Sequence, residues 1–241
     1  MKTITILTCV LGEPPELTDT YNSLVKFLNN EFNWLIKFDG TASPEYVDKF
    51  RKEYINCIQL VDNSLYQAMN QGISLIETEY YFVLGAGDRL AGGELIELWR
   101  KSTETSESSY FFSIKLAKNQ QVLAPNPNEL GFRMACPHPG SILRTKNSLE
   151  IGGFDLKYDI ASDYDHLSRY VKKYGSGRTY TNVLVDYLGG GLSERRAMEG
   201  YLEEELVRKR VWGAHDYAVY SRMITKTSGL ATTILNTLSI E

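Results

Sequence analysis

The chain has 241 residues, of which 43% are hydrophobic and 23% charged, and its formal net charge is −4. This composition is typical of one large globular α/β domain, or of one such domain with a tail, and it excludes a disordered chain. The acidic balance and the lack of a long basic run argue against a protein that holds nucleic acid through its phosphates. Three widely spaced cysteines lack metal-ligand spacing and predict free thiols in a reducing compartment: Cys9, Cys57 and Cys136.

The N-terminal stretch "MKTITILTCVLGEPP" is too short and too polar for a signal peptide, and we interpret it as a strand. No apolar run approaches the roughly 20 residues that cross a bilayer. We therefore expect a cytoplasmic protein, with contact at the inner face of the membrane left open.

Strands and helices alternate through the first half of the chain. Strands are predicted over 3–10, 32–38, 57–61 and 80–84 from β-branched or apolar runs. Helices are predicted after Pro14–Pro15, after Ser43–Pro44 and from Leu65 to Ile76, where apolar residues recur at helical spacing. This alternation predicts a parallel sheet with helices on both faces.

The alternation breaks after residue 100. Strands are predicted over 109–117, 141–144 and 180–188, while 146–161 has an irregular pattern. A helix is predicted over 162–175, where Ser162 and Asp165 have the spacing of an N-cap residue and its N3 partner. A long helix is predicted from about Glu199 to Met223.

Acidic residues directly follow three of the predicted parallel strands. Asp39 follows the second, Asp62 the third, and Asp88 the fourth, within the glycine-rich stretch "GAGD". Ligands bind at the carboxyl ends of parallel strands, so we expect these acids to meet at one edge of the sheet. The alternative is that each Asp only forms a turn or caps a helix.

Carboxylates at such an edge suit a hard cation and a nucleotide. Mg²⁺ or Mn²⁺ shared with phosphate oxygens needs one or two carboxylates, and an Asp can also accept hydrogen bonds from a ribose or a base. The sequence has neither a Walker loop nor a GxGxxG turn. A metal would therefore take over much of the role of a glycine phosphate cradle.

Several stretches together resemble the family 2 glycosyltransferases with the GT-A fold, in particular those of bacterial surface-polysaccharide synthesis. The resemblance runs from about residue 2 to 192. It rests on "ITILTCV", "NWLIKFDG", "VDNSLYQAMNQGISL", "YYFVLGAGDRL" and "HPGSILRTKNSLEIGGFDLKYDIASDYDHLSRY". The implied fold is α/β, with a Rossmann-like, mostly parallel sheet flanked by helices and a C-terminal helical extension.

The resemblance also implies roles for individual residues. Thr8, Val10 and Asp39 would hold the nucleoside, and Asp62 would face its base and ribose. Gly87 and Asp88 would meet the donor diphosphate, with Asp88 as the ligand of Mn²⁺ or Mg²⁺. Asp163 would be the catalytic base, and His138, set between two prolines, would lie near the reacting sugar.

Four further residues have two readings each. Tyr66 and Asn70 either lie beside the nucleotide or only pack the helix. Arg195 and Arg196, in "GGGLSERR", either clamp the diphosphate or belong to a linker. The sequence departs from the family at Gly85 and Gly87, where further carboxylates are common, and at Met69, where Arg is common.

The resemblance implies transfer of a sugar, with inversion, from a nucleoside-diphosphate sugar to a hydroxyl of a saccharide or lipid-linked glycan. UDP-hexose or UDP-N-acetylhexosamine is the donor expected from family frequency. The alternatives are a non-catalytic nucleotide-sugar or glycan-binding module and a sugar-1-phosphate nucleotidyltransferase. The latter lacks support because "CVLGEPPEL" has no basic residue for a triphosphate.

The expected division is a glycosyltransferase domain over 1–196 and a helical extension over 197–241. Residues 1–100 would form the nucleotide-binding half and 101–196 the acceptor and catalytic half. The extension carries basic and aromatic residues, which indicate either contact with anionic lipid or an ordinary packed helix. These residues are Arg208, Lys209, Arg210, Trp212, Tyr217, Tyr220 and Arg222.

Overall fold

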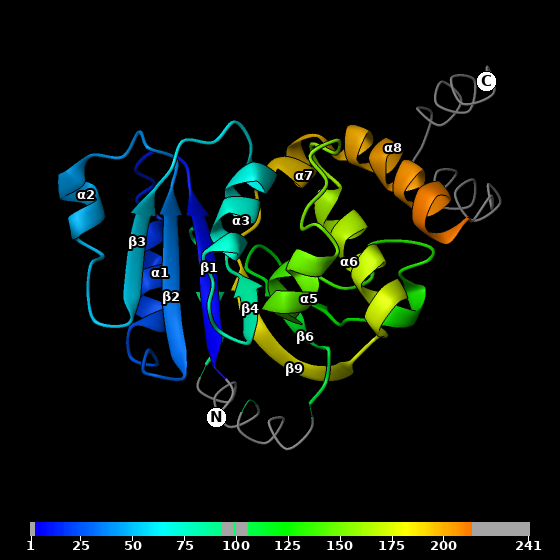
Figure 1. Cartoon of the computed structure of the whole chain (residues 1–241), viewed down its shortest axis with the longest axis horizontal. Coiled ribbons are helices and arrows are strands. Elements are labelled where there is room, and N and C mark those ends of the chain that lie inside the picture. Colours follow the sequence, from blue (N-terminus) through cyan, green and yellow to red (C-terminus); the bar gives the residue numbers. More distant parts are fainter. Residues whose placement is uncertain (1–2, 93–98, 100–105, 214–241) are drawn as a thin grey trace.

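The computed structural model describes residues 3–92, 99 and 106–213. Within these residues the protein is a layered α/β fold around one curled sheet of nine strands (Figure 1). The strands follow the order β3-β2-β1-β4-β8-β6-β9-β5, and β7 pairs with β6. The first four strands in this order are parallel to their neighbours. Of the remaining pairs, β6–β9 is parallel and the others are antiparallel.

The N-terminal half forms the predicted parallel sheet. It contains β1 (Ile4–Val10), α1 (Leu17–Leu24), β2 (Phe32–Phe38), α2 (Pro44–Asp48), β3 (Ile55–Gln59), α3 (Leu65–Ser74) and β4 (Tyr80–Val83). Alternate side chains of β1 face opposite sides of the sheet: Ile4 and Ile6 join the core under α1 and α2, and Leu7 joins the core under α3. The prediction of helices on both faces is therefore confirmed (Figure 1).

The third strand lies two residues earlier than predicted. Its pairing with β2 starts at Ile55 and ends at Gln59. Leu60 and Val61, which the apolar run included in the strand, lie beyond its end and are exposed. Apolarity alone misplaced this strand because a loop can also carry exposed apolar side chains.

The C-terminal half adds β6 (Ser109–Leu116), β8 (Ser141–Arg144), α6 (Ser162–Tyr174) and β9 (Arg178–Tyr187), all near their predicted places. Several short elements were not predicted, among them β5 (Arg89–Leu90), β7 (Val122–Leu123) and α5 (Thr145–Glu150). Helix α5 occupies part of the segment interpreted as irregular. The helix-like segment after Gly92–Gly93 lies outside the described residues, apart from Trp99.

The predicted capping of α6 was wrong. The N-cap residue is Ala161, and the Ser162 hydroxyl donates instead to the carbonyl of Asp155 (2.8 Å). Asp165 is fully buried and forms ion pairs with Arg169 and Arg210. The spacing of Asp165 from Ser162 suggested a cap. Instead, its carboxylate pairs with Arg169, one turn further along α6, and with Arg210, 45 residues away in the sequence.

The last described elements are α7 (Leu192–Arg195), α8 (Ala197–Val207) and a π-helical turn η3 (Arg208–Trp212). Arg208 is buried and donates to Glu205 and to the carbonyl of Phe132, and Arg210 pairs with Asp155. These two arginines face the protein, which favours the packed helix over lipid contact for this part. Tyr217, Tyr220 and Arg222 lie outside the described residues.

Among the described residues, no helix is both long and apolar enough to cross a bilayer. All three cysteines are free thiols, with Cys57 and Cys136 buried and Cys9 partly exposed.

Candidate functional site

Asp39 lies immediately after β2 at the carboxyl edge of the parallel strands. One of its carboxylate oxygens accepts hydrogen bonds from the amides of Gly12 (3.2 Å) and Thr41 (3.1 Å). The Thr41 hydroxyl donates to the same side chain (2.9 Å). Burial opposes ionisation, but these hydrogen bonds outweigh it and hold the pKa of Asp39 below its ordinary value. Asp39 is therefore a fixed, ionised hydrogen-bond acceptor between the loops that follow β1 and β2.

Asp62 has a partner that the sequence analysis missed. The fully buried ammonium of Lys37, on β2, pairs with the Asp62 carboxylate. Buried lysines are rarely found without such a pair. Much of the negative charge of Asp62 is thus neutralised inside the protein, and its predicted contact with a nucleoside would have to use the remaining acceptor capacity.

Asp88, the last residue of the "GAGD" turn, is held by hydrogen bonds from three parts of the chain. Its carboxylate accepts from the amides of Leu188 (2.8 Å) and Gly85 (3.2 Å). The hydroxyl of Thr20, on α1, donates to the Asp88 carbonyl (2.8 Å) and accepts from the Gly87 amide (2.9 Å). Burial raises the pKa of Asp88 to about 6, against the effect of the two amide hydrogen bonds.

Gly87 is required by both conformation and space. Its φ is +97°, and a Cβ atom would lie 2.6 Å from the Leu188 side chain. The segment after β9 therefore packs directly on this turn, which explains why a glycine precedes Asp88.

Asp163 lies in the first turn of α6 and is only partly exposed. Its Oδ1 accepts from the amide of Tyr164 (2.7 Å) and, at 3.4 Å, from the hydroxyl of Tyr66 on α3. Burial raises the pKa of Asp163 to about 6, although these hydrogen bonds oppose the rise. A carboxyl group with this pKa is well suited to accept a proton near neutral pH.

Tyr187, at the end of β9, lies in an acidic environment. Burial, followed by the negative charges of Asp88, Glu194 and Asp163, raises the pKa of Tyr187 to about 12. Asp88 follows β4, and Asp163 contacts Tyr66 in the first turn of α3, which follows β3. Both acids therefore lie on the side of the sheet where the parallel strands end, although 75 residues separate them in the chain.

Comparisons with known proteins show what the chain is similar to. No family model matches the chain. Two uncharacterized glycosyltransferases of Mycobacterium tuberculosis, from strains CDC 1551 / Oshkosh and ATCC 25618 / H37Rv, are each 28% identical to it over 116 residues. The match covers 45% of this chain and 44% of each relative, so it spans less than half the length of these proteins.

Solved structures of S. aureus TarS are also similar. TarS 1–349 in complex with UDP superimposes with a TM-score of 0.66 at 15% identity, covering 86% of this chain and 64% of that one. TarS 1–349 with UDP-GlcNAc gives a TM-score of 0.65 at 14% identity, covering 79% and 59%. The expected GT-A glycosyltransferase fold is confirmed.

Within this glycosyltransferase fold, Asn70 makes contacts that bear on its two interpretations. Its amide nitrogen donates to the Phe154 carbonyl (2.9 Å), and its amide oxygen accepts from the Phe154 amide (2.8 Å). Asn70 therefore joins α3 to the "GGF" turn, which favours the packing interpretation for this residue.

Three other predicted residues are also buried. The Thr8 hydroxyl accepts from the indole of Trp34 (2.9 Å) and Val10 packs in the core, so a ligand could reach only the backbone of these two residues. His138 packs edge-on against Phe154, with ring centroids 5.4 Å apart. Burial lowers the pKa of His138 to about 4, so the imidazole is neutral near pH 7.

The two arginines of "GGGLSERR" lie differently. Arg195 ends α7 and is exposed. Arg196 pairs with Glu199 and, at 3.7 Å, with Asp159. Arg195 therefore remains available as a clamp for a diphosphate. Arg196 is held by one carboxylate of the extension, Glu199, and by Asp159 in the segment before α6.

Few of the described side chains could bind a metal ion at this site. Among the described residues, no three His, Cys, Asp or Glu side chains gather in a way that could hold an ion. Asp88 offers one carboxylate whose oxygens already accept two amide hydrogen bonds. This arrangement is compatible with a cation that takes its other ligands from phosphate oxygens and water, and not with a centre built from protein ligands alone.

Proposed function

We propose that this chain transfers a sugar, with inversion, from a nucleoside-diphosphate sugar to a hydroxyl group of a saccharide or lipid-linked glycan. The observation that carries the proposal is the placement of Asp88 after β4 and of Asp163 against Tyr66 at the start of α3. Both lie on the side of the sheet where parallel strands bind ligands. The curated relatives named glycosyltransferases and the TarS complexes with UDP and UDP-GlcNAc support a donor of the UDP-sugar class.

In the proposed reaction, Asp163 accepts the proton of the acceptor hydroxyl. The acceptor oxygen attacks the anomeric carbon, and the bond from that carbon to the diphosphate breaks with its electron pair leaving on the diphosphate. Asp39 accepts hydrogen bonds from the nucleoside, and Arg195 binds the departing phosphates. A divalent cation, when bound at Asp88, would offset the negative charge of the leaving group.

The division of the chain follows from these roles. Residues 1–100 supply Asp39 and Asp88 and form the nucleotide-binding half, and 101–196 supply Asp163 and form the acceptor and catalytic half. The extension over 197–241 then follows the catalytic domain.

The test is release of nucleoside diphosphate from a panel of nucleotide sugars, with Mn²⁺, with Mg²⁺ and with EDTA. We expect release by the wild type to rise as the pH is raised through about 6, because Asp163 must be ionised to act as a base. Asp163→Asn should lower the rate by about 10²–10⁴-fold. EDTA should lower it in the wild type.

The matched control is Asp48→Asn, which removes an exposed carboxylate at the end of α2 that pairs with Arg51. This variant should keep the wild-type rate. Tight binding of a UDP-sugar without turnover would favour a non-catalytic binding module, and release of pyrophosphate from a nucleoside triphosphate would favour a nucleotidyltransferase. Either result would refute the proposed transfer.

A further inference from the structure

One face of α8 lies against the segment 159–161, which leads into the helix of Asp163. Gly200 and Glu203 are three residues apart on α8 and therefore share a face. A Cβ atom at Gly200 would lie 3.1 Å from the Ile160 side chain, so the helix backbone approaches this segment closely. Figure 1 shows α8 running along the outer side of α6.

The Glu203 carboxylate binds three consecutive backbone amides of this segment. One oxygen accepts from the amide of Asp159 (3.0 Å), and the other accepts from those of Ile160 and Ala161 (2.8 Å each). Hydrogen bonds to a charged acceptor are about twice as strong as neutral ones. Three of them on adjacent residues fix the path of the chain as it enters α6.

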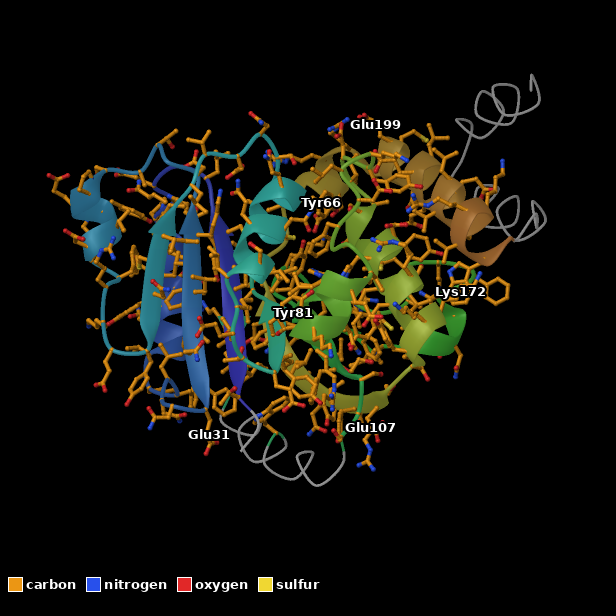
Figure 2. All side chains as sticks on the ribbon, in the orientation of Figure 1. Glu31, Tyr66, Tyr81, Glu107, Lys172 and Glu199 are labelled. Carbon is orange, nitrogen blue, oxygen red and sulfur yellow. The ribbon has the colours of Figure 1, made fainter. Side chains whose placement is uncertain are left out.

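Tyr66 holds the same segment from the opposite side. Its hydroxyl donates to the carbonyl of Ile160 and contacts Asp163 Oδ1 at 3.4 Å. Tyr66 projects from α3 toward the C-terminal half of the molecule (Figure 2). Ile160 is thus held through its amide by Glu203 of α8 and through its carbonyl by Tyr66 of α3. The next residue, Ala161, is the N-cap of α6 and lies two residues before Asp163.

We propose that Glu203 is a positioning residue for Asp163: by binding the amides of 159–161, it sets the place and direction of the proposed base. This inference rests on the proposed function, because it assigns Glu203 a part in the same reaction. It also gives α8 a role in building the catalytic site, although the sequence analysis placed α8 outside the catalytic domain.

The charge of Glu203 has a second effect. Burial is the largest cause of the raised pKa of Asp163, and the negative charge of Glu203 adds to the rise. A variant without this charge should therefore let Asp163 ionise at a lower pH. Glu203→Gln removes the charge and keeps the length of the side chain, so it separates this effect from a general loosening of the segment.

The experiment compares Glu203→Gln and Glu203→Ala with the wild type in the diphosphate-release assay. Glu203→Ala should lower kcat by up to roughly 10²-fold with little change in the KM for the donor, because a small displacement of a catalytic group has that effect. Glu203→Gln keeps the side-chain length and one acceptor oxygen. Its loss of kcat should be smaller, and its acidic limb should move to lower pH.

A second readout needs no turnover. Hydrogen exchange at the amides of 159–161 should become faster by on the order of tenfold in Glu203→Ala, since three hydrogen bonds are lost. The control is Glu150→Gln, which removes an exposed carboxylate on α5 that pairs with Lys173 on α6. It should leave kcat, the pH profile and this exchange as in the wild type.

Different results would refute the positioning role of Glu203 and the proposed sugar transfer. A folded Glu203→Ala variant with wild-type kcat and pH profile, or with unchanged exchange at 159–161, would overturn the positioning role while leaving the transferase proposal intact. Absence of turnover by the wild type with every donor would overturn the transferase and the positioning role with it, and the exchange data would then show only whether Glu203 holds the segment.

Discussion

Lys37 is a charged residue inside a strand that otherwise packs in the core. It is fully buried, and Asp62, in the loop after β3, is only slightly exposed. An ion removed from water in this way is stable only while its partner is present, because the cost of desolvating an unpaired charge is several kcal/mol. The pair therefore fixes Asp62 beside β2 before any ligand binds.

We predict that Lys37→Met and Asp62→Asn each destabilise the protein by about 3 kcal/mol, because each leaves one member of the pair buried without its counter-charge. The double variant should be less destabilised than the sum of the two single changes. Urea unfolding followed by circular dichroism measures all three. Additive losses would show that the two side chains do not interact.

The sequence identified several single residues but not their partners. Asp39 and Asp88 could be found because an acid directly after a strand stands out in the printed sequence. The engagement of Asn70 with Phe154 could not be found, because its partner is a backbone group 84 residues away. Lys37 was visible as a charge in an apolar strand, which was the signal that could have indicated a buried pair.

At the scale of elements, α3 and the turn before α6 form one packed unit. Asn70 holds both backbone groups of Phe154, and the Phe154 ring stacks on Tyr66 (5.5 Å) and on His166 (4.5 Å between centroids). The turn reaches this position because Gly153 adopts a φ of +66° in contact with Asn70.

A matched pair of glycine variants tests this unit. Gly152 and Gly153 both have positive φ, so alanine is strained at either position by about 1–3 kcal/mol. Only at Gly153 would the Cβ atom also collide with Asn70, at 2.4 Å from its Oδ1, whereas at Gly152 there is open space. Gly153→Ala should therefore be less stable than Gly152→Ala by roughly 2 kcal/mol, from the loss of the Asn70 hydrogen bonds.

Thermal and denaturant unfolding of the two variants give this difference directly, since the strain is common to both. Equal stabilities would mean that Asn70 can move aside without loss.

Long elements were predicted well and short ones were not. The strands β1, β2 and β6 and the helices α3 and α6 lie close to their predicted places, because each carries a sustained period of apolar residues. The two-residue strands β5 and β7 have no period of their own. They exist because β9 and β6 supply hydrogen-bonding partners.

At the scale of the whole molecule, the C-terminal elements belong to the core. Val207 and Val211, from α8 and η3, are buried in the same cluster as Tyr66, Tyr164 and Leu167. Arg210 of η3 also pairs with Asp155 and Asp165. The boundary predicted at residue 196 therefore separates residues that pack against each other.

Two truncations test the importance of these contacts. A chain that ends at 196 should lose cooperative unfolding, because each buried valine contributes about 1.5–3 kcal/mol and Asp165 would lose one of its two cations. A chain that ends at 213 keeps every contact described above and should unfold cooperatively. Near-ultraviolet circular dichroism and calorimetry distinguish the two chains, and a stable chain ending at 196 would confirm an independent domain.

The sequence by itself determined the layered α/β fold, the parallel half of the sheet and the acids at its edge, because these depend on local periodicity and on the direction in which strands run. Only the tertiary structure decided which polar groups meet: Lys37 with Asp62, Asn70 with Phe154, and Glu203 with the segment before Asp163. Such pairs join residues 25 to 84 positions apart. Hydrogen bonds and ion pairs act over a few ångströms, so no pattern along the chain reveals them until folding has brought the partners together.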